Sequence, residues 1–100
     1  MATMYISEFA AIGGTGNFVV SGAQQTPIAE QTVAIGANTQ SNTFNTKTML
    51  IRLNCDSICS VEFGTNPAAT TSKMRMAANQ TEYFTIPPNS GWKLAVISNT

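Results

Sequence analysis

Apolar and polar residues alternate with a period of two along much of this chain, in short runs separated by turn-forming residues. Alternation over a few residues is typical of a half-buried strand. The clearest runs cover 32–35, 48–53, 59–63, 73–76 and 82–86. We expect their inward side chains to be Val33, Ile35, Met49, Ile51, Leu53, Cys59, Val61, Phe63, Met74, Met76, Phe84 and Ile86.

The remaining segments complete an all-β pattern. Residues 5–9 and 18–20 are further strands, 41–45 is a weak strand around Phe44, and 13–17 and 87–91 are turns rich in Gly, Pro or Asn. Because Pro27 cannot donate a backbone hydrogen bond, it is expected either in an edge strand or at the start of a strand. No apolar stripe of helical spacing runs past one turn.

About eight short strands joined by short links predict a single domain, residues 1–100, folded as an antiparallel β-sandwich. A closed barrel is the second choice. The last run, 92–98, is apolar on both faces except for Lys93. Such a strand is either central between two layers or covered by a neighbouring subunit.

Composition points to a contact protein rather than an enzyme. The 100 residues include no His, and 36 of them are Ser, Thr, Asn or Gln. Only 10% are charged, against ~25% in typical domains, and the net charge is zero. Proton transfer near neutrality most often uses His, and phosphate binding needs clustered Lys and Arg. We therefore expect no enzymatic activity, no cofactor, no nucleic-acid partner and no membrane partner.

The five acids, Glu8, Glu30, Asp56, Glu62 and Glu82, fall in different expected strands or turns. Each is interpreted as a solvent-facing charge that favours solubility. The Gly-rich segment 13–16 lacks the Lys of a phosphate-binding loop and precedes no helix, so it is interpreted as a turn.

Cys55 and Cys59 are the chain's two cysteines. Each continues an inward-facing set, which favours buried free thiols that behave as small hydrophobic groups. A disulfide across the turn between them is the alternative. A metal site is disfavoured because metals need three or four ligands.

Three aromatic residues with polar tips, Tyr5, Tyr83 and Trp92, are candidates for contacts, since such residues are enriched at interfaces. Trp92 is favoured as a core residue of the last strand. For the tyrosines the contact and core interpretations are balanced.

Several segments of the second half resemble small virion-associated proteins of tailed bacteriophages. These segments are RLNCDSICSVEFG at 52–64, NPAATT at 66–71, MRMAANQTEYF at 74–84, the prolines at 87–88, and KLAVI at 93–97. The resemblance is to capsid decoration or cement proteins. It implies a jelly-roll-like sandwich, a homo-oligomer with a trimer favoured, and the major capsid protein as partner.

A protein of that class would stabilise the phage head by bridging capsomers, and would be made in the host cytoplasm without a signal peptide and then reside in the virion. Residues 1–12 would then be an extended contact arm through Met4, Tyr5, Ile6 and Phe9, although an ordinary first strand is slightly favoured. The loop 64–72, with Asn66 and Pro67, would be a contact tip. The alternative function is a carbohydrate-binding or tail-fibre-type recognition module using Tyr83 and Trp92.

Overall fold

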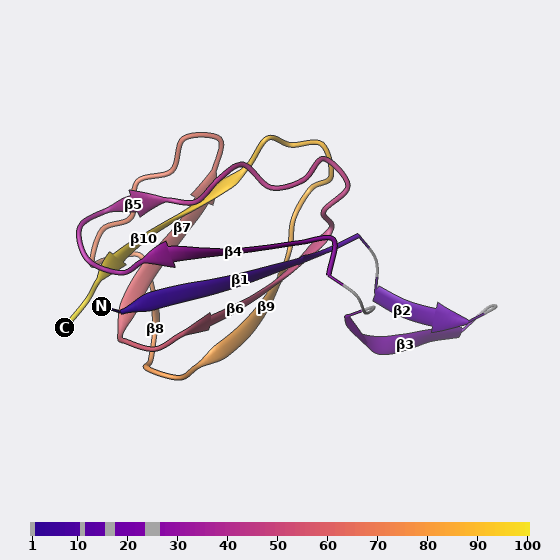
Figure 1. Cartoon of the computed structure of the whole chain (residues 1–100), viewed down its shortest axis with the longest axis horizontal. Coiled ribbons are helices and arrows are strands. Elements are labelled where there is room, and N and C mark those ends of the chain that lie inside the picture. Colours follow the sequence, from indigo (N-terminus) through magenta and orange to yellow (C-terminus); the bar gives the residue numbers. More distant parts are fainter. Residues whose placement is uncertain (1, 11, 16–17, 24–26) are drawn as a thin grey trace.

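The computed structural model describes the backbone of residues 2–10, 12–15, 18–23 and 27–100, and the side chains of residues 2–10 and 27–100 (Figure 1). The described residues form ten strands and no helix. These are β1 (Thr3–Phe9), β2 (Ile12–Thr15), β3 (Phe18–Ala23), β4 (Ala29–Ala34), β5 (Thr39–Gln40), β6 (Leu50–Cys55), β7 (Cys59–Gly64), β8 (Met74–Met76), β9 (Thr81–Thr85) and β10 (Lys93–Ser98).

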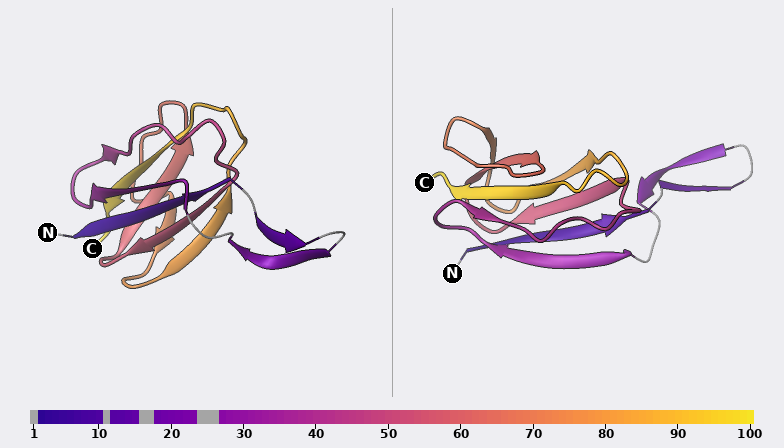
Figure 2. Two further views of the ribbon diagram at one scale, coloured as in Figure 1. Left: turned by 45° about the vertical axis from the view of Figure 1, so that its right-hand side comes forward. Right: turned by 90° about the horizontal axis from the view of Figure 1, so that it is seen from above.

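Eight of the strands build two antiparallel four-stranded sheets that pack face to face. Sheet I has the order β4-β1-β6-β9, and sheet II has the order β5-β10-β7-β8. The sheets do not close into a barrel, so the predicted β-sandwich is confirmed. Strands β2 and β3 pair only with each other among the described residues, and this hairpin projects from one end of the sandwich (Figures 1 and 2).

The strand pairing has the nested order of a jelly roll. Four antiparallel pairs are nested along the chain. The pair β7 with β8 is innermost, followed outward by β6 with β9, β5 with β10, and β4 with β1. Such an arrangement is an antiparallel ribbon rolled into two sheets. Here β1 takes the place that the last strand has in an ordinary jelly roll. The chain is therefore a circularly permuted jelly roll, in which the hairpin lies in the link between β1 and β4.

The core lies between the two sheets, where the inward positions meet. Its fully buried members include Ile6, Ile51 and Leu53 from sheet I and Val61 and Leu94 from sheet II. The rings of Phe63 on β7 and Phe84 on β9 lie 5.3 Å apart between centroids and connect the sheets. Alternation along the strands therefore predicted most of the core correctly.

Three sequence-based expectations about strands are wrong. Residues 41–45 are not a strand, because the strand of this region is the shorter β5 before them. Met49, which precedes β6, and Met74, the first residue of β8, are about half exposed, so neither belongs to the core. The expected turn at 13–17 is largely strand β2, and residues 16 and 17 lie outside the described part of the chain.

Candidate contact surfaces

The N-terminal segment is a strand inside sheet I and not an extended arm. β1 pairs with β4 on one side and with β6 on the other. Its side chains Met4, Ile6 and Phe9 are buried, so they cannot serve as contacts with another protein in this structure. Tyr5 alone among the four proposed arm residues is exposed. The arm interpretation of residues 1–12 is corrected in favour of the ordinary first strand.

The loop of residues 65–72, named here the covering loop, lies across the outer face of sheet II. At one side the Gln40 side-chain amide donates hydrogen bonds to Asn66 Oδ1 (2.9 Å) and to the Pro67 carbonyl oxygen (2.8 Å). At the other side the Asn99 amide donates to the Thr71 carbonyl oxygen (3.2 Å). The loop thus spans from β5 to the end of β10.

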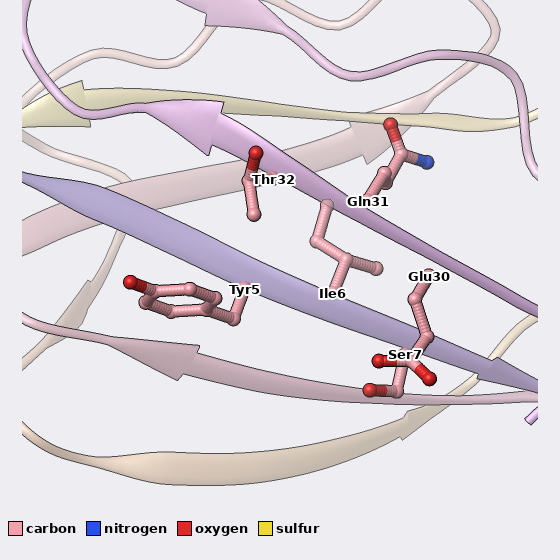
Figure 3. Close-up of a pocket in the computed structure, with 6 residues that line it drawn as sticks. All are labelled: Tyr5, Ile6, Ser7, Glu30, Gln31 and Thr32. Carbon is pink, nitrogen blue, oxygen red and sulfur yellow. The ribbon is translucent and has the colours of Figure 1, made fainter.

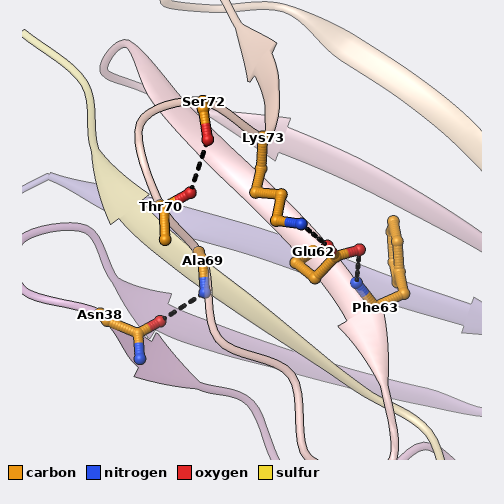
Figure 4. A network of polar contacts seen from close by, with 7 residues as sticks. All are labelled: Asn38, Glu62, Phe63, Ala69, Thr70, Ser72 and Lys73. Atoms are coloured by element: carbon orange, nitrogen blue, oxygen red, sulfur yellow. Dashed lines mark hydrogen bonds and ion pairs between the residues drawn. The ribbon is translucent and has the colours of Figure 1, made fainter.

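A further contact fixes the middle of the covering loop. The backbone N–H of Ala69 donates to Asn38 Oδ1 (2.8 Å), and Thr70 shares a hydrogen bond with Ser72 (Figure 4). Ala69 and Pro67 are buried, whereas Asn66 is exposed. Of the two residues predicted at the contact tip, Asn66 is therefore available to a partner and Pro67 is not.

The covering loop explains why the last strand is apolar on both faces. Leu94 and Val96 belong to the core, so Ala95 faces outward, and it is nevertheless fully buried. Ser60, outward on β7, is also buried and accepts a hydrogen bond from Asn99 (2.8 Å). The strand is central in its sheet, and its outer face is covered by the same chain rather than by a neighbouring subunit.

On the outer face of sheet I, named here the open face, two aromatic side chains stay exposed, whereas Phe9 and Leu50 in the same outward rows are buried. Tyr5 is 47% exposed and Tyr83 is 53% exposed. In the strand register Asn54 lies opposite Tyr5, and Arg52 lies opposite Tyr83, with both partners on β6 between them. The open face therefore presents two tyrosines separated by an amide and a guanidinium.

A pocket of about 300 Å³ lies on strands β1 and β4 beside Tyr5 (Figure 3). Ser7 and Glu30 are register partners across these strands, as are Tyr5 and Thr32. The pocket is lined by Tyr5, Ile6, Ser7, Glu30, Gln31 and Thr32. It combines one aromatic wall with hydroxyl, amide and carboxylate groups.

Trp92 directly precedes β10. Its side chain is partly buried and packs against the core cluster, which confirms the core interpretation. Of the two residues expected to form the recognition face, Tyr83 is the exposed one and Trp92 is partly buried. Tyr83 instead shares the open face with Tyr5.

Glu8 is buried, which contradicts its interpretation as a solvent-facing charge. The residue is 2% exposed, and its Oε1 accepts hydrogen bonds from the Asn45 backbone N–H (2.7 Å) and the Thr48 hydroxyl (2.7 Å). Buried carboxylates are stable only when they are well hydrogen-bonded. Glu8 therefore anchors the segment that leads into β6.

The cysteines are buried free thiols, as the alternation along β6 and β7 predicted. Cys55 donates a hydrogen bond from its Sγ to the Ala77 carbonyl oxygen (3.0 Å). Burial, reinforced by the adjacent Cys55, raises the pKa of Cys59 to about 12. Since the thiolate is the reactive species, Cys59 is a poor nucleophile at neutral pH.

The other charged groups do not converge on one site. Glu62 on the outer side of β7 pairs with Lys73 at 3.0 Å, just after the covering loop (Figure 4). Hydrogen bonds from Lys73 and from the Phe63 backbone N–H hold the pKa of Glu62 below its ordinary value. Within residues 2–10 and 27–100, no group of three or more His, Cys, Asp or Glu side chains is placed to hold a metal ion.

Comparison with known proteins assigns the chain to no family and no function. Neither a protein-family model, nor a curated protein, nor a solved structure matches the chain. The described part of the chain also has no helix long and apolar enough to cross a membrane.

Proposed function

We propose that this protein is a non-enzymatic structural component of a tailed-bacteriophage virion, a decoration or cement protein that binds the major capsid protein. The observation that carries the proposal is the projecting hairpin β2–β3. It replaces residues 1–12 as the contact arm. The resemblance of the second half of the sequence to phage virion proteins supplies the identity of the partner.

The hairpin has the properties of an element that another chain completes. A two-stranded hairpin is at best marginally stable alone in water and needs a further strand or a packing surface. β2 and β3 pair with no other strand of the described chain, and they extend away from the sandwich (Figure 2). Pairing with a strand of a partner would extend this two-stranded sheet through backbone hydrogen bonds.

The sequence of the hairpin favours such pairing. No charged residue occurs between Glu8 and Glu30, whereas strand edges that must avoid pairing are commonly protected by charges or Pro. The hairpin also carries Phe18, Val19 and Val20 in direct succession. It is therefore suited to bind another chain through its backbone.

Exposed apolar side chains at the base of the hairpin enlarge the surface that a partner could contact. Ile28 and Met49 are 40% and 49% exposed. Both are hydrogen-bonded through their backbone N–H groups to the end of β1, Ile28 to Glu8 and Met49 to Phe9. They lie where the chain leaves β1 for the hairpin, so a partner that binds the hairpin can also bury them. Because the net charge is zero, neighbouring copies bound to one capsid would repel each other little.

Binding to capsids tests the proposal. Heads of the encoding phage, prepared without this protein, are mixed with the purified chain and sedimented. We expect the full chain to co-sediment saturably. A variant with a short Gly-Ser linker in place of residues 12–23 is expected to keep its fold by circular dichroism and to lose binding.

A matched pair of point variants separates the hairpin from the body. Val19→Asp places a charge on the hairpin strand β3 and is expected to weaken capsid binding about tenfold or more. Thr32→Asp places the same charge on the open face and is expected to leave binding unchanged. Absence of the chain from purified virions, or full binding by the linker variant, would refute the proposal. Light scattering of the free protein tests the trimer.

A further inference from the structure

We propose that the open face of sheet I is a binding site for a neutral oligosaccharide, with Tyr5 and Tyr83 as stacking platforms. This inference concerns a different surface from the hairpin and does not depend on the capsid role. It rests on an exposed aromatic pair, a pocket beside one member of the pair, and the charge of the groups between them.

The tyrosines are the first observation. Each is about half exposed, whereas the apolar Phe9 and Leu50 in the same outward rows are buried. Tyrosine offers a flat apolar ring for the C–H face of a sugar and a hydroxyl for its polar rim. Because a tyrosine side chain has only two torsion angles, it loses little conformational entropy when a ligand fixes it.

Their spacing suits an extended ligand. β6 separates the two strands, and the register places Tyr83 opposite Arg52 and Tyr5 opposite Asn54, two residues further along. Standard sheet dimensions then put the two Cα atoms about 12 Å apart. That separation is too large for one sugar ring and fits a chain of several rings that crosses β6.

The pocket on β1 and β4 supplies the polar half of the site (Figure 3). Its volume of about 300 Å³ lies at the lower end of the range for small-molecule sites. Ser7 and Thr32 offer hydroxyls, and the exposed Glu30 offers two acceptor oxygens that can bridge neighbouring sugar hydroxyls. A sugar ring against Tyr5 would place its hydroxyl groups toward these three side chains.

The charge of the open face selects a neutral ligand. Glu30 and Arg52 are the charged side chains on the outward rows of the two tyrosines, and their charges cancel. An acidic polysaccharide or a nucleic acid would need an excess of cations. A protein partner would favour a more apolar centre, whereas Asn54, Ser7 and Arg52 lie between the rings.

Titration of the full chain with defined glycans tests the site. Malto-, cello-, chito- and mannohexaose are added in turn while calorimetry reports affinity and backbone amide shifts report location, with a hyaluronan hexasaccharide as the acidic comparison. We expect saturable binding of at least one neutral glycan, with the largest shifts on β1, β4 and β6, and no binding of the acidic one.

Substitutions then assign the platforms. Tyr5→Ser is expected to weaken binding about tenfold, and Tyr83→Ser several-fold, because each removes one stacked ring. Met74→Ser is the matched control, since Met74 is equally exposed but lies on β8 of sheet II. Unfolding temperatures of the variants verify that all three remain folded.

Three outcomes would overturn the proposal. These are the absence of saturable binding to every neutral glycan, equal binding by Tyr5→Ser and the unmodified chain, and preferential binding of the acidic glycan. Loss of capsid binding in Tyr5→Ser without an effect on glycans would make the open face a protein contact instead.

Discussion

The two outer faces of the sandwich differ in what lies over them. On sheet II the covering loop buries Ala95 and Ser60 under a segment of the same chain. On sheet I Tyr5 and Tyr83 remain exposed. A sheet face whose apolar side chains are covered within the chain has no need of a partner, whereas exposed tyrosine rings are enriched on binding surfaces. The contrast therefore separates a face covered within the chain from a face on which aromatic rings stay exposed.

The strongest test of this contrast introduces the same bulky side chain on both faces. Ala95→Tyr places a ring beneath the covering loop, where no space exists, and overpacking of this kind typically costs a few kcal/mol. We expect the free energy of unfolding in urea to fall by about 2–3 kcal/mol. Thr32→Tyr on the open face is the control, with an expected change within about 0.5 kcal/mol. Equal effects of the two substitutions would show that both faces are equally open.

A smaller effect is expected when the covering loop loses one anchor. Asn38→Ala leaves the backbone N–H of the buried Ala69 without its acceptor, which costs about 1–2 kcal/mol. Hydrogen exchange should accelerate at residues 66–71 and stay unchanged on sheet I. Thr70→Ala removes an exposed hydroxyl from the same loop and serves as the control. Unchanged protection of the loop in Asn38→Ala would contradict its role as a fixed cover.

The smallest effect concerns acid. Because the pKa of Glu62 is lowered by Lys73, the folded chain favours the ionised carboxylate. The contribution of this pair to stability is full above the ordinary carboxyl pKa of about 4.3 and is lost as the pH falls through the lowered value. The pair is exposed, so the change in unfolding should be too small for urea titration.

Carbon-detected NMR measures the titration of Glu62 directly. Lys73→Gln is expected to raise the midpoint toward the ordinary value, and Lys47→Gln, a distant exposed lysine, is expected to leave it in place. An unchanged midpoint in Lys73→Gln would mean that Lys73 does not join β7 to the end of the covering loop in solution.

Sequence alone predicted the class of fold because alternation determines which side of a strand is buried. Val33, Ile51, Leu53, Cys55, Cys59 and Val61 were placed correctly by this rule. The rule fails for Met49 and Met74, which continue the alternation but are about half exposed. It also fails for Glu8, whose burial depends on hydrogen-bond partners about forty residues away.

The surfaces were harder to predict than the core. The covering loop is held by Asn38, Gln40 and Asn99, which are distant from it in sequence and carry no local signal of that role. The sequence predicted a strand at 18–20, but nothing in it indicates that β2 and β3 form a hairpin separate from the two sheets. Tyr5 was identified as a candidate for contact, yet its position on one face with Tyr83 follows only from the strand order.

In the permuted order of strands, the start of β1 and the end of β10 lie at one end of the sandwich, and the hairpin lies at the other end (Figure 1). The Ala2 carbonyl and the Ser98 N–H both bond to the turn at residues 35–36, so β1 begins and β10 ends beside each other, at the opposite pole from the hairpin (Figure 1). A peptide or enzyme genetically appended after Thr100 would sit at the rear of a subunit attached through its hairpin. If the proposed attachment to a capsid through the hairpin holds, copies on the shell would all carry the appended cargo on their outward side.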